Sequence, residues 1–222
     1  MKKIKWGVIG TAGIARSCTI PGMIQAYNCE LYAIAGRSID KAEQFKEKFG
    51  FEKAYGSYKE LLDDPEVEAV YIALPNTLHY EWAVKAMKSG KHVLCEKPLA
   101  PCEKQVKELF ETAKENHVYL MEAFAYQHSP YITAIKKEIE DGTKGSITGT
   151  KFAFNGDGEL SYTIRTAEGQ EEVKTVEVPQ NYRLEVEQFG RCIDENEKPA
   201  VTEEFSLKNV RLVERILEEI GY

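Results

Sequence analysis

The first half of the chain alternates short apolar runs with amphipathic stretches. The apolar runs predict strands at residues 4–10, 30–36, 68–74, 91–96 and 118–121. Between them, apolar residues recur at helical spacing, which predicts helices at about 13–27, 39–49, 57–63, 77–89 and 102–116. Continuously apolar strands that alternate with helices are typical of a parallel sheet covered on both faces. We therefore predict a doubly wound α/β domain over residues 1–122.

After residue 122 the pattern changes to period-two alternation, which is typical of antiparallel strands. A helix at about 130–140 precedes predicted strands at 145–155, 158–166 and 171–179, joined by the turns "NGDG" and "AEGQ". Two helices, at about 181–194 and 206–219, end the sequence, and the second places Leu207, Val210, Val213, Leu217 and Ile220 on one face. We predict a second α+β domain over residues 123–222 with a small antiparallel sheet, linked near residues 122–130.

Composition narrows the class of protein and its partners. The 222 residues are 43% hydrophobic and 29% charged, which is ordinary for a soluble globular protein. A net charge of −7 argues against nucleic acid or an anionic membrane as the main partner. The lysines and apolar stretch at the start resemble a signal peptide, but Arg16 and the glycine pattern fit a strand and turn better. Five scattered cysteines without a C-x-x-C pair suit reduced thiols, so we expect a cytoplasmic protein without a metal site.

A glycine-containing turn follows the first predicted strand and opens the first helix. It fits the dinucleotide-binding pattern G-x-G-x-x-G/A with an alanine in the middle position, and its residues are Gly10, Thr11, Ala12, Gly13 and Ile14, before Ala15. Such a turn brings backbone N–H groups and a helix N-terminus against a pyrophosphate. We interpret it as a Rossmann-type cofactor turn; the alternative is a tight turn without a ligand.

The second predicted strand ends at Gly36, where an NAD site would carry an acidic residue for the ribose 2′-hydroxyl. Arg37 and Ser38 stand there instead, and a guanidinium with a hydroxyl suits a 2′-phosphate. This favours NADP over NAD as cofactor. The alternative is that Arg37 is only a solvated residue at the start of a helix.

The next two strands end in further candidate site residues. Because ligands of open α/β sheets bind at the carboxyl ends of the strands, we expect cofactor contacts there. The candidates are Leu74, Pro75, Asn76, His79, Glu96 and Lys97. A partly desolvated lysine beside a nicotinamide could act as general acid and base, whereas a Glu96–Lys97 ion pair would only shape the loop. His79 could face the same crevice or be structural.

Several segments together resemble the glucose–fructose oxidoreductase/inositol dehydrogenase (Gfo/Idh/MocA) family of NAD(P)-dependent sugar and polyol oxidoreductases. They are "GVIGTAGIA", "AGRS", "PNTLH", "GKHVLCEKPLA" and "MEAFAYQHSP", the last being most similar to dimeric dihydrodiol dehydrogenases. The resemblance runs from residue 4 to about 155 and resumes over about 182–220. It implies that Lys97 contacts nicotinamide and substrate and is held by a cis bond to Pro98. It also implies a sugar, polyol or dihydrodiol substrate, with Lys97 handling the proton. We take Lys97 and His79 as the candidate catalytic residues.

The chain departs from this family in its second half. Members carry a larger antiparallel sheet and a helix with a G-G-x-x-x-D-x-G-x-x-H/Y-type motif, which is missing where the chain passes from residues 152–154 to "NGDGELSYTI". Gln127 stands where many relatives have Arg. His79, Tyr126 and His128 are candidates to replace the missing catalytic partners, and the alternative for Tyr126 and His128 is packing at the hinge between the domains. Two functions therefore stay open: an NADP-dependent oxidoreductase, or a dinucleotide-binding protein with little or no turnover. A homodimer is also a hypothesis.

Overall fold

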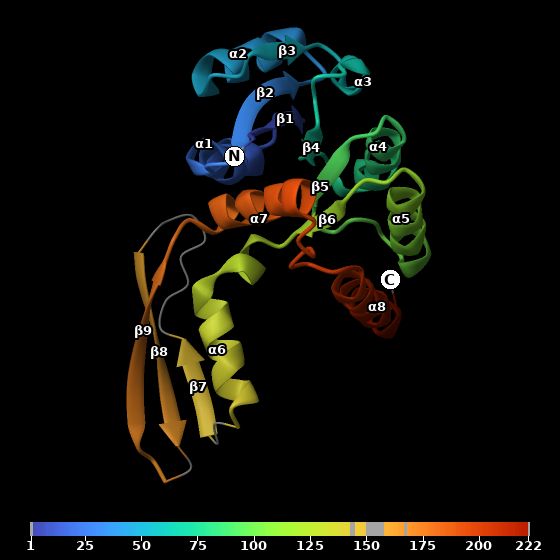
Figure 1. The fold of residues 1–222 in the computed structure, drawn as a ribbon. Coiled ribbons are helices and arrows are strands. Elements are labelled where there is room, and N and C mark those ends of the chain that lie inside the picture. Colours follow the sequence, from blue (N-terminus) through green and yellow to red (C-terminus); the bar gives the residue numbers. More distant parts are fainter. Residues whose placement is uncertain (1, 143–144, 150–157, 167, 222) are drawn as a thin grey trace.

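The structure is a computed structural model that describes residues 2–142, 145–149, 158–166 and 168–221. Its larger part is built around a six-stranded parallel sheet (Figure 1). Its strands are β1 (Ile4–Ile9), β2 (Cys29–Ala35), β3 (Lys53–Tyr55), β4 (Ala69–Ile72), β5 (His92–Glu96) and β6 (Leu120–Ala123). They lie in the order β3-β2-β1-β4-β5-β6, and each neighbouring pair is parallel. This strand order is that of the doubly wound dinucleotide-binding fold, so the predicted fold class is confirmed.

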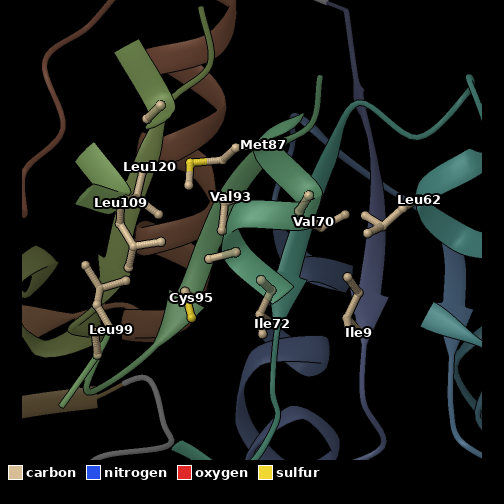
Figure 2. Close-up of a cluster of buried hydrophobic side chains, with 14 of the residues drawn as sticks. Ile9, Leu62, Val70, Ile72, Met87, Val93, Cys95, Leu99, Leu109 and Leu120 are labelled. Atoms are coloured by element: carbon tan, nitrogen blue, oxygen red, sulfur yellow. The ribbon is translucent and has the colours of Figure 1, made fainter. Parts of the chain in front are cut away.

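Helices cover both faces of this sheet. They are η1 (Ala15–Thr19), α1 (Ile20–Gln25), α2 (Ile39–Phe49), α3 (Tyr58–Asp63), α4 (Asn76–Lys88) and α5 (Glu103–Glu115). Successive strand residues point to opposite faces, so β4 sends Val70 and Ile72 to one core and Tyr71 to the other. Figure 2 shows the first of these cores, in which side chains from β4 and β5 meet Met87 of α4 and Leu109 of α5. The continuously apolar strands therefore reflect burial on both faces.

The last two helices return to the parallel sheet. Helix α7 (Asn181–Glu195) packs on the face that carries α1, where the ring centroids of Phe189 and Trp6 are 5.7 Å apart. Helix α8 (Glu203–Glu219) packs against α5 (Figure 1). Arg211 of α8 donates two hydrogen bonds of 2.8 Å to Glu103. Both helices follow residue 122 in sequence yet cover the first sheet. The division into domains 1–122 and 123–222 stays a prediction.

A small antiparallel sheet lies between β6 and α7 in the sequence, as predicted. The short helix η2 (Ala125–His128) and helix α6 (Pro130–Glu140) precede this sheet in the sequence. Its strands are β7 (Gly145–Gly149), β8 (Gly158–Thr166) and β9 (Glu171–Val178), in the order β7-β8-β9. The inner face of the sheet packs on α6 through Tyr131, Leu160, Tyr162, Ile164 and Val178. This face forms a separate hydrophobic core, away from the parallel sheet (Figure 1).

The elements differ from the sequence predictions in a few places. Strand β3 was not predicted, because three residues are too few to show a periodic pattern. The predicted helix at 13–27 contains the π-helical turn η1, and the strand predicted at 118–121 lies at 120–123. The last helix begins at Glu203, three residues early, because Thr202 caps it by accepting the Phe205 N–H at 3.2 Å. Residues 150–155 of a predicted strand, the turn at 155–157 and residue 167 lie outside the described residues.

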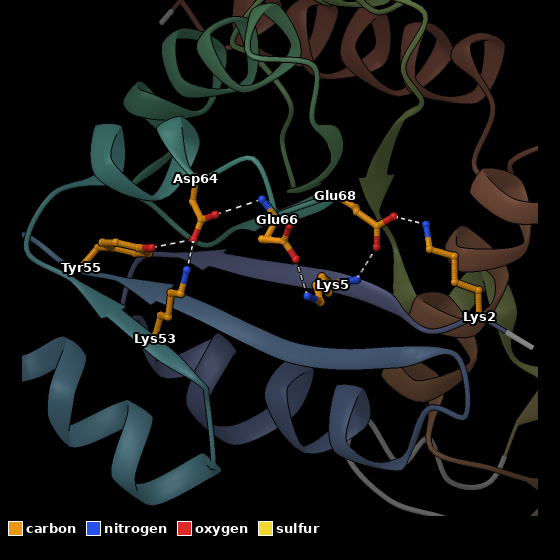
Figure 3. Close-up of polar contacts among 7 residues, drawn as sticks. All are labelled: Lys2, Lys5, Lys53, Tyr55, Asp64, Glu66 and Glu68. Carbon is orange, nitrogen blue, oxygen red and sulfur yellow. Dashed lines mark hydrogen bonds and ion pairs between the residues drawn. The ribbon is translucent and has the colours of Figure 1, made fainter.

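The amino-terminal edge of the parallel sheet is held by charged side chains (Figure 3). The Asp64 carboxylate, in the turn between α3 and β4, accepts hydrogen bonds from Tyr55 (2.6 Å), Lys53 (2.9 Å) and the Glu66 N–H (2.9 Å). Burial acts to raise the pKa of Asp64, but these three donors outweigh it and lower the pKa to about 2. These contacts occupy the amino-terminal end of the sheet, so the carboxyl-terminal ends of the strands are the ones available to ligand groups.

Candidate cofactor and catalytic site

The glycine turn is shaped by a backbone that only glycine can supply. Gly10 has a φ of +106°, and a Cβ atom there would lie 2.3 Å from the carbonyl oxygen of Ala73. Its N–H donates to the Ala35 carbonyl at 2.9 Å, so the turn is held at the carboxyl ends of β1 and β2. A Cβ added at Gly13 would meet no atom within 4 Å of the described chain. This open space at the start of a helix fits a pyrophosphate.

A cleft of about 510 Å³ begins at this turn. Seven of the predicted cofactor residues line it, namely Gly10, Thr11, Ala12, Arg37, Ser38, Leu74 and Pro75. Four residues that the sequence analysis did not select also line it: Lys41 of α2, Tyr58 of α3, Ala73 after β4 and Leu78 of α4. The cleft thus contains two cationic side chains, and its described lining has no carboxylate.

The polar groups at the outer end of the cleft suit a phosphate. Ser38 is the N-cap of α2, yet its hydroxyl makes no capping hydrogen bond and is available to a ligand. Burial raises the pKa of Tyr58, and the nearby positive charge of Arg37 acts in the opposite direction, so this guanidinium lies close to the ring. Among the salt bridges of the described chain, none involves Arg37 or Lys41. The arrangement can hold a dianion between a guanidinium, an ammonium and a helix N-terminus.

His79 has a different place from the one predicted for a catalytic group. Its ring is fully buried, and its two nitrogens lie 2.7 Å from the Pro98 carbonyl oxygen and 2.8 Å from the Leu74 carbonyl oxygen. Both ring nitrogens are therefore used by the backbone. His79 thus joins the end of β4 to the loop after β5, which agrees with the structural alternative for this residue, and its catalytic role stays a prediction.

Lys97 and Glu96 stand at the carboxyl end of β5. The Glu96 carboxylate is buried and accepts a hydrogen bond of 2.5 Å from the Tyr71 hydroxyl, which in turn accepts one of 2.9 Å from Thr19. In the described residues Glu96 and Lys97 form no salt bridge, which argues against the ion-pair interpretation. Lys97 is exposed, and its bond to Pro98 is cis, as the family resemblance implied. The ammonium group is therefore free to meet a ligand at this edge.

A buried acidic side chain lies behind this strand end. Glu185 of α7 is fully buried, and neither of its carboxyl oxygens has a hydrogen-bond partner within the described chain. Burial, together with the negative charge of Glu96, raises the pKa of Glu185 well above its usual value. Burial also raises the pKa of Glu96, and the Tyr71 hydrogen bond and the charge of Lys97 offset part of the effect. The carboxyl groups of Glu96 and Glu185 are therefore both buried and lie near enough to each other to interact.

The remaining predicted residues lie apart from the cleft. Ile14 lies at the start of the first helix, and Asn76 lines a second cavity beside α8. Tyr126 packs edge-on against Phe124 at a centroid distance of 5.8 Å. Burial lowers the pKa of His128 to about 4, helped by the charge of Arg191 on α7, so a neutral imidazole packs against that helix. These two contacts support hinge packing for Tyr126 and His128.

Lys41 could have been found from the sequence, because it follows Arg37 by about one helical turn. Tyr58 and Glu185 gave no such signal, since their positions depend on how α3 and α7 pack on the sheet.

Comparison with known proteins agrees with this geometry. Residues 4–124, more than half of the chain, match the model of an oxidoreductase family with an NAD-binding Rossmann fold, GFO_IDH_MocA. The chain belongs to the Gfo/Idh/MocA family. The predicted family is confirmed by this match.

Two curated relatives are named enzymes. One is a dTDP-3,4-didehydro-2,6-dideoxy-alpha-D-glucose 3-reductase from Actinomadura kijaniata, 40% identical over 151 residues that cover 68% of this chain and 45% of the relative. The other is the trans-1,2-dihydrobenzene-1,2-diol dehydrogenase of Mus musculus, 34% identical over 166 residues that cover 74% of this chain and 49% of the relative. The chain thus spans about half the length of the curated relatives it matches.

A solved Gfo/Idh/MocA-like structure shares the fold. It is a 3-ketoreductase from Actinomadura kijaniata in complex with NADP and TDP-benzene, with a TM-score of 0.81 and 22% identity over 96% of each chain. An aldose-aldose oxidoreductase from Caulobacter crescentus gives a TM-score of 0.79 at 14% identity, over 100% of this chain and 99% of that one.

The unpartnered Glu185 carboxyl predicts a specific pH dependence of stability. Its pKa is higher in the folded chain than in the unfolded chain. Its contribution to stability is therefore complete below the unfolded value of about 4.3 and is lost as the pH rises through the folded value. We expect the free energy of unfolding of Glu185→Gln, relative to that of wild type, to increase as the pH rises above the unfolded value of about 4.3.

Urea unfolding at several pH values measures this difference. The control is Glu195→Gln, an exposed carboxylate at the end of the same helix, which should show a difference that does not change with pH. A Glu185→Gln curve parallel to that of wild type would contradict the assignment.

Proposed function

We propose that this chain is an NADP-dependent oxidoreductase that transfers a hydride between nicotinamide and a hydroxyl-bearing or carbonyl carbon of a sugar, polyol or dihydrodiol. The proposal is based on the cleft at the glycine turn. Its described lining contains Arg37, Ser38 and Lys41 and no carboxylate. A ribose 2′-hydroxyl would call for an acidic partner, whereas a 2′-phosphate calls for cations. NADP therefore fits this lining better than NAD.

The other end of the cofactor site would lie near β5. In this proposal the pyrophosphate rests on the turn Gly10–Ile14, and the nicotinamide half extends past Leu74 and Pro75 toward Lys97. The assignments of Asn76, Glu96 and Lys97 as cofactor contacts stay part of the proposal. His79 would act indirectly, by fixing the carbonyl ends of Leu74 and Pro98 that border the site.

A bound nicotinamide supplies or accepts the hydride at its C4 atom. The chain's own contribution at the reacting centre is Lys97. Its ammonium group donates a proton to the carbonyl oxygen during reduction, and the amine takes the proton back during oxidation. The buried Tyr71–Glu96 hydrogen bond fixes the end of β5, so the backbone of the adjacent Lys97 is held in position.

The substrate class rests on the named relatives, one of which is a sugar-nucleotide 3-reductase and another a dihydrodiol dehydrogenase. Both act on a carbon that bears a hydroxyl or carbonyl group. We propose the same reaction class here and commit to no particular substrate.

A second candidate function has its own support. The small sheet β7–β9 is the only antiparallel sheet in the described residues, and the chain spans about half the length of its curated relatives. Because partner groups contribute orders of magnitude to rate, a reduced second half affects turnover more than cofactor affinity. The alternative is therefore a dinucleotide-binding protein with little or no catalytic activity.

The cofactor preference depends on Arg37. We expect Arg37→Glu to weaken NADPH binding by at least about tenfold and to leave NADH binding nearly unchanged, since only NADPH carries the 2′-phosphate. Fluorescence titration with both dinucleotides measures the two affinities. Lys48→Glu makes the same type of charge change on α2 outside the cleft and serves as the control. An unchanged NADPH/NADH affinity ratio in Arg37→Glu would refute the assignment.

The proton-handling role depends on the Lys97 ammonium group. We expect Lys97→Met to lower turnover by at least about 100-fold, while the NADPH dissociation constant changes by less than about threefold. The assay follows NADPH oxidation or NADP⁺ reduction with sugars, polyols, dihydrodiols and α-keto aldehydes. Lys88→Met, at the exposed end of α4, is the matched control.

Three other outcomes of this assay decide between the candidate functions. Tight NADPH binding by wild type with no turnover of any substrate supports the binding-protein alternative. Failure to bind either dinucleotide overturns both functions. Full activity in Lys97→Met overturns the role of that lysine.

Association into a homodimer and a cytoplasmic location stay predictions. No helix of the described chain is long and apolar enough to cross a membrane. The exposed edge strand β9 turns Lys174 inward, where it contacts Glu138 of α6 at 2.5 Å. An inward-pointing charge of this kind protects a sheet edge from pairing with another strand, so a dimer would have to form elsewhere.

A further inference from the structure

A second cavity, separate from the cofactor cleft, lies between α8 and the loop that follows Lys97. Its volume is about 240 Å³, and its walls are mainly apolar, formed by Leu99, Pro101, Val106, Val210, Val213 and Leu217. It shares no lining residue with the cleft at the glycine turn. The first turn of α4 separates the two, with Leu74, Pro75 and Leu78 on the cleft side and Asn76 and Thr77 on the cavity side.

Two deeply buried polar side chains also line this apolar cavity. Glu122 of β6 is 2% exposed, and its Oε1 atom accepts the Leu99 N–H at 3.1 Å. Ser206 of α8 is 1% exposed, and its hydroxyl lies beside the Glu122 carboxyl. Burial raises the pKa of Glu122, and the neighbouring Ser206 hydroxyl and Leu99 N–H act in the opposite direction. A carboxyl buried among apolar side chains gains from a further hydrogen-bond donor, which a ligand could supply.

The size and lining define the kind of molecule that fits. An apolar cavity of about 150 Å³ can hold benzene, so about 240 Å³ has room for a fused two-ring molecule. The Glu122 carboxyl favours a ligand with one N–H or O–H group. Apolar walls with a few convergent polar groups are typical of small-molecule sites.

We propose that this cavity is a second binding site, for a small, largely apolar molecule with one hydrogen-bond donor directed at the Glu122 carboxyl. A ligand there would touch Pro98 and Leu99, the residues that directly follow Lys97. The proposal is independent of dinucleotide binding.

The test uses indole as the probe and indene as its isostere without an N–H group. Saturation-transfer NMR on the full chain should give an indole dissociation constant of about 1 mM or below, with indene two- to tenfold weaker. Val213→Trp fills the cavity from α8 at a position that is 42% exposed in the chain and should weaken indole binding at least about tenfold. Leu212→Trp, on the adjacent residue that is 58% exposed and outside the cavity lining, should bind indole like wild type.

A second filling variant, Leu217→Trp, serves if Val213→Trp does not fold, as judged by circular dichroism. No saturation transfer to indole in wild type overturns the proposal. Equal indole binding in a folded filling variant and in Leu212→Trp also overturns it. Indene that binds as tightly as indole overturns the proposed ligand chemistry.

Discussion

The parallel sheet with two buried faces is the constraint on which the rest of the structure depends. Its central strand β4 sends Val70 and Ile72 into one core and Tyr71 into the other, so no strand face is left for a ligand. Ligand groups must therefore come from the strand ends. At the amino ends, Asp64 and its partners hold the turns together. The carboxyl ends carry the Gly10 turn and Lys97, and this edge is where open α/β sheets bind ligands.

The same constraint explains the path of the C-terminal half. A sheet with an uncovered face would expose apolar surface, so helices α7 and α8 return to it after the small antiparallel sheet. Phe189 of α7 completes one core and Val210 of α8 extends the other. The small sheet has its own core with α6, so its size can vary without opening the parallel sheet. The return of α8 to the parallel sheet also places this helix beside the loop after Lys97, and the second cavity lies between the two.

Much of the fold and part of the candidate site could be predicted from the sequence. Apolar runs gave the strands, and because parallel strands end at one edge, Gly10, Arg37 and Pro75 could be expected in one cleft. Side-chain orientation could not be predicted. His79 follows a strand end as a catalytic residue might, yet both of its ring nitrogens face backbone carbonyls. Glu185 lies in an amphipathic helix, and only the packing of α7 on the sheet buries it. Lys97 was correctly placed at the end of β5, while its chemistry remains a proposal.

The proposed function depends on NADP binding along the carboxyl ends of the parallel strands, with the 2′-phosphate at Arg37 and the nicotinamide at Lys97. A crystal structure of the chain with NADP⁺ would show where the cofactor lies. We expect the 2′-phosphate in contact with Arg37 and Lys41, the pyrophosphate on the turn at Gly10–Ile14, and the nicotinamide ring beside Lys97. A dinucleotide bound elsewhere, or one whose 2′-phosphate contacts neither cation, would contradict it.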